Sequence, residues 1–173
     1  MLVYGDFTGD EQVLLRRSLL AAAVAVSAAS PGREEETVSE GFAAASFILD
    51  RRDDYVRFPL ITSVIAWLQE QANAEQAFPD FVKVAEAPEA LPQAMETLRG
   101  VAALLDTRVD PDETAAYKGW LMSIATAVAA AGKEDQGFLG RGGVAVNDKE
   151  RLALAAIAGV LGVASDPAAE TNR

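Results

Sequence analysis

Two stretches of this chain are similar enough to indicate an internal duplication. The alignment of residues 10–31 with residues 112–133 continues with Glu40 opposite Glu150, and its offset grows from 102 (112 − 10) to 110 (150 − 40). Each copy has the pattern of an acid-capped helix, a polar loop that is eight residues longer in the second copy, and a helix that opens at a glutamate. A repeated helical hairpin predicts a pseudo-symmetric bundle. The eight identical pairs are Asp10/Asp112, Glu11/Glu113, Leu19/Leu121, Ala23/Ala125, Ala25/Ala127, Val26/Val128, Ala28/Ala130 and Ala29/Ala131.

Helix start signals recur where helical periodicity of apolar residues begins. Thr8 has capping-box spacing to Glu11, and the pair Asp110-Pro111 places a capping aspartate before a proline. The same spacing predicts helix starts at residues 37–40, after an acidic loop over 33–36, and at residues 147–150. No segment alternates as a strand does, so we expect an all-α fold with about seven helices.

The length of 173 residues suits one domain that buries roughly 70% of its unfolded surface. We expect a single helical domain over residues 1–163, with copy one at about 8–49, central helices at about 58–108 and copy two at about 110–163. Residues 164–173 are expected to form a flexible tail. In the second helix of each copy, the positions expected to face the core are Phe42, Ala45, Ile48 and Leu49, and Leu152, Ala155, Ala156, Ile157 and Val160.

The composition excludes several kinds of chemistry. The chain has no cysteine and no histidine, so thiolate chemistry is absent, and so is the commonest side chain for acid–base work near pH 7. Its 26 acidic and 15 basic residues give a net charge of −11, and such a surface repels nucleic acid. The apolar run over residues 18–30 is short for a membrane span, and acidic residues precede it where a signal peptide would be basic. We therefore expect a cytoplasmic location without a membrane span.

The glycine-rich loop over residues 137–143 is the most conspicuous local feature. A phosphate-binding loop would need a preceding strand and a different glycine spacing, so we expect a compact surface loop instead. Because this loop is the insertion in copy two, it is the best candidate for a partner surface, with Phe138, Leu139 and Arg141 as contact residues.

The acidic hairpin loops could hold a hard cation, because Ca²⁺ and Mg²⁺ take carboxylate oxygens. The candidate ligands are Glu40, Glu150, Asp135 and Asp148. Both glutamates are also explained as capping-box residues, so a purely structural role stays open.

No residue pattern predicts a catalytic site. Carboxylate pairs such as Asp112 and Glu113 are expected at helix ends, where capping explains them. Trp67 and Trp120 are expected to be core or interface aromatics, although an apolar ligand pocket lined by these two residues and Met122 is an alternative.

The turn over residues 28–32 and the segment Val38-Ser39-Glu40-Gly41-Phe42-Ala43 resemble the tellurite-resistance TerB-like family. In that family an Ala-Asp-Gly turn precedes a helix start similar to Val-Ser-x-x-Glu, in an acidic all-helical domain. Glu40 and Glu150 match the family glutamate, whereas Ser30 stands at the aspartate position and copy two has no acid there. The resemblance implies a role in tellurite or stress response and divalent-cation binding. The missing aspartates weaken only the implied cation binding.

Three functions follow as hypotheses. The first is a non-enzymatic TerB-like protein that acts through contacts with a protein partner or with a second copy of itself. The second is a Ca²⁺ or Mg²⁺ binding module, and the third is a small-ligand-binding helical domain.

Overall fold

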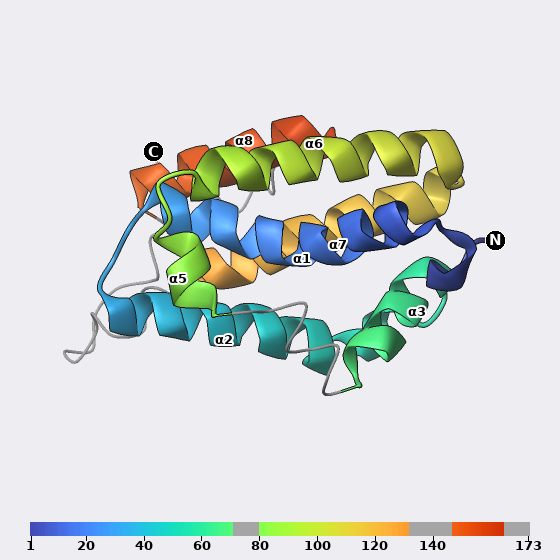
Figure 1. The fold of residues 1–173 in the computed structure, drawn as a ribbon, viewed down its shortest axis with the longest axis horizontal. Coiled ribbons are helices and arrows are strands. Elements are labelled where there is room, and N and C mark those ends of the chain that lie inside the picture. The colour runs from blue at the N-terminus through green and yellow to red at the C-terminus, as the bar shows by residue number, and fades with distance from the viewer. Residues whose placement is uncertain (71–79, 132–146, 165–173) are drawn as a thin grey trace.

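The computed structural model describes residues 1–70, 80–131 and 147–164. These residues form an all-α fold with seven α-helices and no strand, which confirms the predicted fold class (Figure 1). Two 3-10 turns, η1 (Tyr4–Asp6) and η2 (Arg52–Tyr55), complete the regular structure. The helices are α1 (Gly9–Ala29), α2 (Glu34–Asp50), α3 (Pro59–Leu68), α5 (Phe81–Ala85), α6 (Ala90–Arg108), α7 (Pro111–Ala131) and α8 (Asp148–Leu161).

Helix α1 is the centre of the bundle. Residues 21–27 are buried without interruption, so α1 is covered on every side along this stretch. It packs against α2, α5, α6, α7 and α8 (Figure 1). The alanines of this stretch allow several helix axes to come close, while Leu15 and Leu19 fill the space nearer its N-terminus.

Most helix starts lie where the capping signals predict them. The Thr8 hydroxyl accepts a hydrogen bond from the Glu11 amide, and the Glu11 carboxylate accepts one from the Thr8 amide. Asp110 accepts from the Glu113 amide at the start of α7, and Asn147 with Glu150 forms a complete capping box at the start of α8.

The predicted start of α2 is wrong. The helix begins at Glu34, with Arg33 as its N-cap, and the Glu36 carboxylate accepts from the Arg33 amide. The expected acidic loop is therefore the first turn of the helix, where three glutamates complement the helix dipole. Glu40 lies in the second turn and caps nothing.

The predicted inward faces of α2 and α8 are partly wrong. Phe42 and Leu152 are each 71% exposed, and Leu49 is 44% exposed. The buried face of α2 contains Thr37, Glu40, Ala44 and Ile48, and that of α8 contains Glu150, Ala153, Leu154, Ile157, Ala158 and Leu161. Of the other predicted positions, Ile48 and Ile157 are buried as expected, Ala45 and Val160 are half-buried, and Ala155 and Ala156 are exposed.

The packing of the two hairpins has the form that a duplication would produce. The first helix of each copy contacts the second helix of the other, α1 against α8 and α7 against α2, and the two first helices contact each other. Aligned positions also have similar surroundings, since Glu40 and Glu150 are both buried and Phe42 and Leu152 are both exposed. The duplication itself stays a prediction.

By its length and composition, helix α1 could form a membrane span. Its 21 residues are long and apolar enough for one, and it is the one helix of the described residues that meets this criterion. Much of α1 is buried inside the bundle, as in the core helix of a soluble protein. The absence of a membrane span and the cytoplasmic location therefore stay predictions.

The short helix α5 docks on α2 at a glycine. A Cβ atom at Gly41 would lie 2.9 Å from the Phe81 ring, which is closer than real Cβ contacts. We predict that Gly41→Ala lowers the free energy of unfolding by about 1–3 kcal/mol, because the ring must leave its place. Thermal denaturation followed by circular dichroism measures this loss. Gly119→Ala is the matched control, since a Cβ there meets nothing within 4 Å and alanine favours the helix; equal melting temperatures for both variants would contradict the prediction.

Candidate functional site

The two helix-opening glutamates predicted from the duplication come together near the end of α1. Glu40 on α2 is 6% exposed and Glu150 on α8 is 5% exposed. Each carboxylate lies close enough to the other for the charge of Glu150 to act on Glu40. Two carboxyl groups from opposite ends of the sequence therefore share one partly buried region.

Residues at the end of α1 hold both glutamates in place. The Ser27 side chain forms a hydrogen bond with the Glu40 carboxyl group. The Asn147 side-chain amide donates to the Ser30 hydroxyl over 3.0 Å, and the Asn147 backbone amide donates to Glu150 Oε2 over 3.0 Å. The last residues of α1 thus fix the start of α8 and contact α2.

Burial raises the pKa of the Glu40 carboxyl group above its ordinary value. The hydrogen bond from Ser27 opposes this shift, and the charges of Glu150 and Glu36 add to it. Glu36 itself has a lowered pKa because it accepts hydrogen bonds from Arg33. A buried carboxyl group beside a second carboxylate favours a bound proton or a nearby cation.

The other predicted site residues do not join this pair within the described structure. Asp148 is exposed and forms an ion pair with Arg151. Asp135, Phe138, Leu139 and Arg141 lie outside the described residues. Among residues 1–70, 80–131 and 147–164, no group of three or more acidic side chains is arranged to hold a metal ion.

Exposed apolar side chains on α2 form a second feature, which the sequence analysis missed. Val38, Phe42 and Leu49 are 41%, 71% and 44% exposed. At about 100° per residue they lie within about 40° of one another around the helix, so they form one apolar stripe. The spacing of four and seven residues along the sequence could have indicated this stripe. The apolar face of a helix that packs against a core has the same spacing, so the signal is ambiguous.

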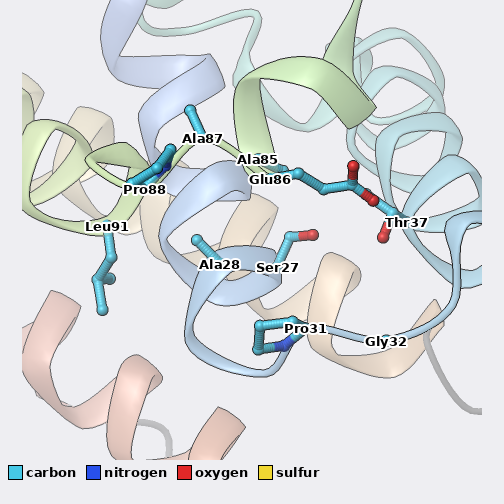
Figure 2. Close-up of a pocket in the computed structure, with 10 residues that line it drawn as sticks. All are labelled: Ser27, Ala28, Pro31, Gly32, Thr37, Ala85, Glu86, Ala87, Pro88 and Leu91. Atoms are coloured by element: carbon cyan, nitrogen blue, oxygen red, sulfur yellow. The ribbon is translucent and has the colours of Figure 1, made fainter.

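A cleft of about 430 Å³ lies beside the end of α1 (Figure 2). Its walls come from the last turn of α1, the α1–α2 turn, and the segment that joins α5 to α6. The lining residues are Ser27, Ala28, Pro31, Gly32, Thr37, Ala85, Glu86, Ala87, Pro88 and Leu91. Sequence reasoning missed this cleft, because it is formed by residues from distant parts of the chain.

Trp67 and Trp120 pack in or against the core, as expected, and do not form the alternative ligand pocket with Met122. Trp120 is fully buried and packs edge-on against Tyr117, and Met122 is 7% exposed. Trp67 contacts the Tyr4 ring and the Arg16 guanidinium group. None of them lines the cleft.

Glu113 in the first turn of α7 has a structural role. Glu113 is 3% exposed, and its Oε1 atom accepts a hydrogen bond from the Leu60 amide over 2.6 Å. This contact caps the N-terminus of α3. Its counterpart Glu11 instead forms an ion pair with Arg108 over 2.6 Å, so the two aligned acids do different work.

Comparisons with protein-family models, with curated proteins and with solved structures find no match to this chain. The resemblance to the TerB-like family is therefore untested, and the functional argument depends on the geometry described above.

The raised pKa of Glu40 predicts an unusual pH dependence of stability. Its contribution to stability is fully present below the ordinary carboxyl pKa of 4.5 and is lost as the pH rises through the folded-state pKa. Glu40→Gln should therefore raise the melting temperature at pH 7 by about 2–4 °C, and the gain should vanish near pH 4.

Melting curves between pH 4 and pH 8, in buffer with EDTA, measure this difference. The exposed residue Glu89 provides the matched control, since Glu89→Gln should leave the curve close to that of the parent chain. A Glu40→Gln variant that melts below the parent by the same amount at every pH would show that the carboxylate is not destabilising.

Proposed function

We propose that this chain is a non-enzymatic, TerB-like helical module that acts through protein contacts, in a stress response such as tellurite resistance. The observation that carries the proposal is the apolar stripe of Val38, Phe42 and Leu49 on α2. Scattered exposed apolar residues are normal, but aligned ones on a single helix mark a contact surface.

The charge around the stripe supports a protein partner of opposite sign. The first turn of α2 contains Glu34, Glu35 and Glu36, and the helix ends at Asp50, with Arg33 and Arg51 at its caps. Arg33 pairs with Glu36, and Arg51 pairs with Asp54. An apolar stripe between acidic helix ends fits a partner that presents apolar side chains flanked by lysine or arginine.

Leu152 extends the argument to the second copy. It is as exposed as Phe42 and occupies the aligned position, two residues after the buried glutamate. A partner that recognises α2 would meet a similar but smaller apolar side chain on α8. Phe42 is therefore expected to contribute more to binding than Leu152, because aromatic side chains bury more area.

Truncation of Phe42 tests the proposal. We predict that Phe42→Ala reduces partner recovery from the native extract at least tenfold, because interface aromatics often contribute more than 1 kcal/mol. Stability should stay within about 0.5 kcal/mol of the parent, since Phe42 is exposed. Quantitative mass spectrometry of proteins co-purified with each variant is the measurement.

Ser46→Ala serves as the control in this experiment, since Ser46 is also exposed on α2. If the parent chain and Phe42→Ala recover the same proteins in equal amounts, the apolar stripe on α2 is not the contact surface. The absence of any specifically enriched protein with the parent chain would contradict a role through protein contacts.

A divalent-cation site at Glu40 and Glu150 is a second candidate function. What favours it is the approach of these two buried carboxyl groups, with the Ser27 hydroxyl beside Glu40. A hard cation would offset the repulsion between the carboxylates and accept oxygen ligands from both helices.

We predict that Ca²⁺ or Mg²⁺ at 100 times its dissociation constant stabilises the fold by about 2.7 kcal/mol. Titration calorimetry and melting curves with each ion provide the measurement. Glu40→Gln and Glu150→Gln should abolish the effect, whereas Glu89→Gln should retain it. Absence of binding heat and an unchanged melting temperature would exclude this candidate.

A further inference from the structure

The cleft beside the end of α1 has the size of a small-molecule site. Its volume of about 430 Å³ lies within the range of roughly 300–1,000 Å³ for ligand pockets. Three separate segments form it, and all of them belong to the packed bundle: α1, the α1–α2 turn with the start of α2, and the α5–α6 connection.

One part of the cleft wall is apolar. Alanine, proline and leucine side chains cover it, and the two prolines restrict their own backbone. This surface can pack against a short alkyl chain, and the described lining residues include no aromatic ring for stacking. Its members are Ala28, Pro31, Ala85, Ala87, Pro88 and Leu91.

The polar part of the cleft is acidic. The Glu86 side chain reaches across the cleft, with its carboxylate toward Thr37 (Figure 2). Ser27 adds a hydroxyl group on the same side, and no lysine or arginine is among the described lining residues. A ligand group bound here would meet a negative charge and hydroxyl oxygens that can accept hydrogen bonds.

The end of α1 adds to the negative potential. The last backbone carbonyls of a helix have no partner within the helix, and they form the negative end of its dipole. Helix α1 is 21 residues long and has no basic residue in its last turn. Ser27 and Ala28 of this turn line the cleft, so the negative end of the α1 dipole lies at its edge. The starts of α2 and α6 also border the cleft, and the positive ends of their dipoles oppose that of α1. Three glutamates in the first turn of α2 offset the positive end there, and the Glu86 carboxylate supplies the full charge that favours a cation.

From these observations we propose that the cleft binds a primary ammonium group on a short alkyl chain. The ammonium group lies between the Glu86 carboxylate and the end of α1, where it donates hydrogen bonds to oxygen atoms. The alkyl chain lies on the apolar wall. This binding site is separate from the stripe on α2 and does not depend on the function proposed above.

Two sources could supply this chemistry, a free alkylamine or the side chain of a lysine. Titration of the full chain with n-butylammonium, followed by NMR chemical shifts of the cleft residues, tests the free amine. Nα-acetyl-lysine methylamide tests the lysine side chain. Binding of n-butylammonium alone assigns the site to a free amine, and tighter binding of the lysine derivative assigns it to a lysine of a protein.

Glu86→Gln should weaken binding of either probe about tenfold, because it removes the charge and keeps the shape. Ala28→Leu should also weaken binding by filling the cleft, and melting curves verify that both variants fold. Glu89→Gln is the matched control, since this acid is three residues away, exposed and outside the cleft lining. It should leave the affinity unchanged.

Butyrate and 1-butanol distinguish the contribution of the positive charge from that of the alkyl chain, because they have a similar chain with a negative charge or no charge. Neither should bind as well as n-butylammonium. The proposal is overturned if no probe gives saturable shifts in the cleft or if butyrate binds equally well. It is also overturned if Glu89→Gln weakens binding as much as Glu86→Gln, because that result would show general attraction to an acidic surface.

Discussion

The close packing of helices around α1 is the constraint on which the rest of the structure depends. Residues 21–27 are buried without interruption, and alanine occupies four of these positions, Ala21, Ala22, Ala23 and Ala25. Small side chains allow neighbouring axes to approach, and larger ones would force them apart at a cost of about 1–3 kcal/mol. One further tie is the Tyr117 hydroxyl, which donates to the Leu15 carbonyl over 3.1 Å inside the core. Because α1 contacts both α2 and α8, its position determines where these two helices can lie.

The end of α1 is where the features with possible function meet. Ser27 contacts Glu40 on one side and lines the cleft on another, and Ser30 accepts a hydrogen bond from the cap of α8. The TerB-like motif, which this turn resembles, would place an aspartate at the position of Ser30. A serine there can still join the two hairpins through Asn147 while adding no third negative charge to the glutamate pair. Ser30 therefore helps to connect the two helices without adding charge for a cation.

The sequence predicts the helices well because capping depends on neighbouring residues. Thr8 with Glu11, Asp110 with Pro111, and Asn147 with Glu150 each specify a helix start through contacts within four residues. The start of α2 was misplaced because two overlapping signals compete, and Glu36 caps Arg33 where Glu40 was expected to cap Thr37. The exposed side of α2 was misjudged for a different reason. A stripe such as Val38, Phe42 and Leu49 satisfies helical periodicity whether it faces a core or a partner, so periodicity alone cannot tell the two apart.

Because α2 begins at Glu34, the two buried glutamates Glu40 and Glu150 have different structural roles. Glu150 serves as a capping residue, because its amide and carboxylate both bond to Asn147, so its position near the bundle interior has a local cause. Glu40 has no such cause, since the N-cap of its helix is seven residues earlier, at Arg33. Burial of a carboxyl group without a capping role costs stability unless a proton or a cation offsets its charge. The two aligned glutamates thus have different roles. Glu150 caps its own helix, whereas Glu40 is buried by the packing of α1 and α2 without capping a helix. The two hairpins therefore differ in the length of their loops and also in the roles of Glu40 and Glu150. Glu40 is the glutamate whose burial calls for a functional explanation.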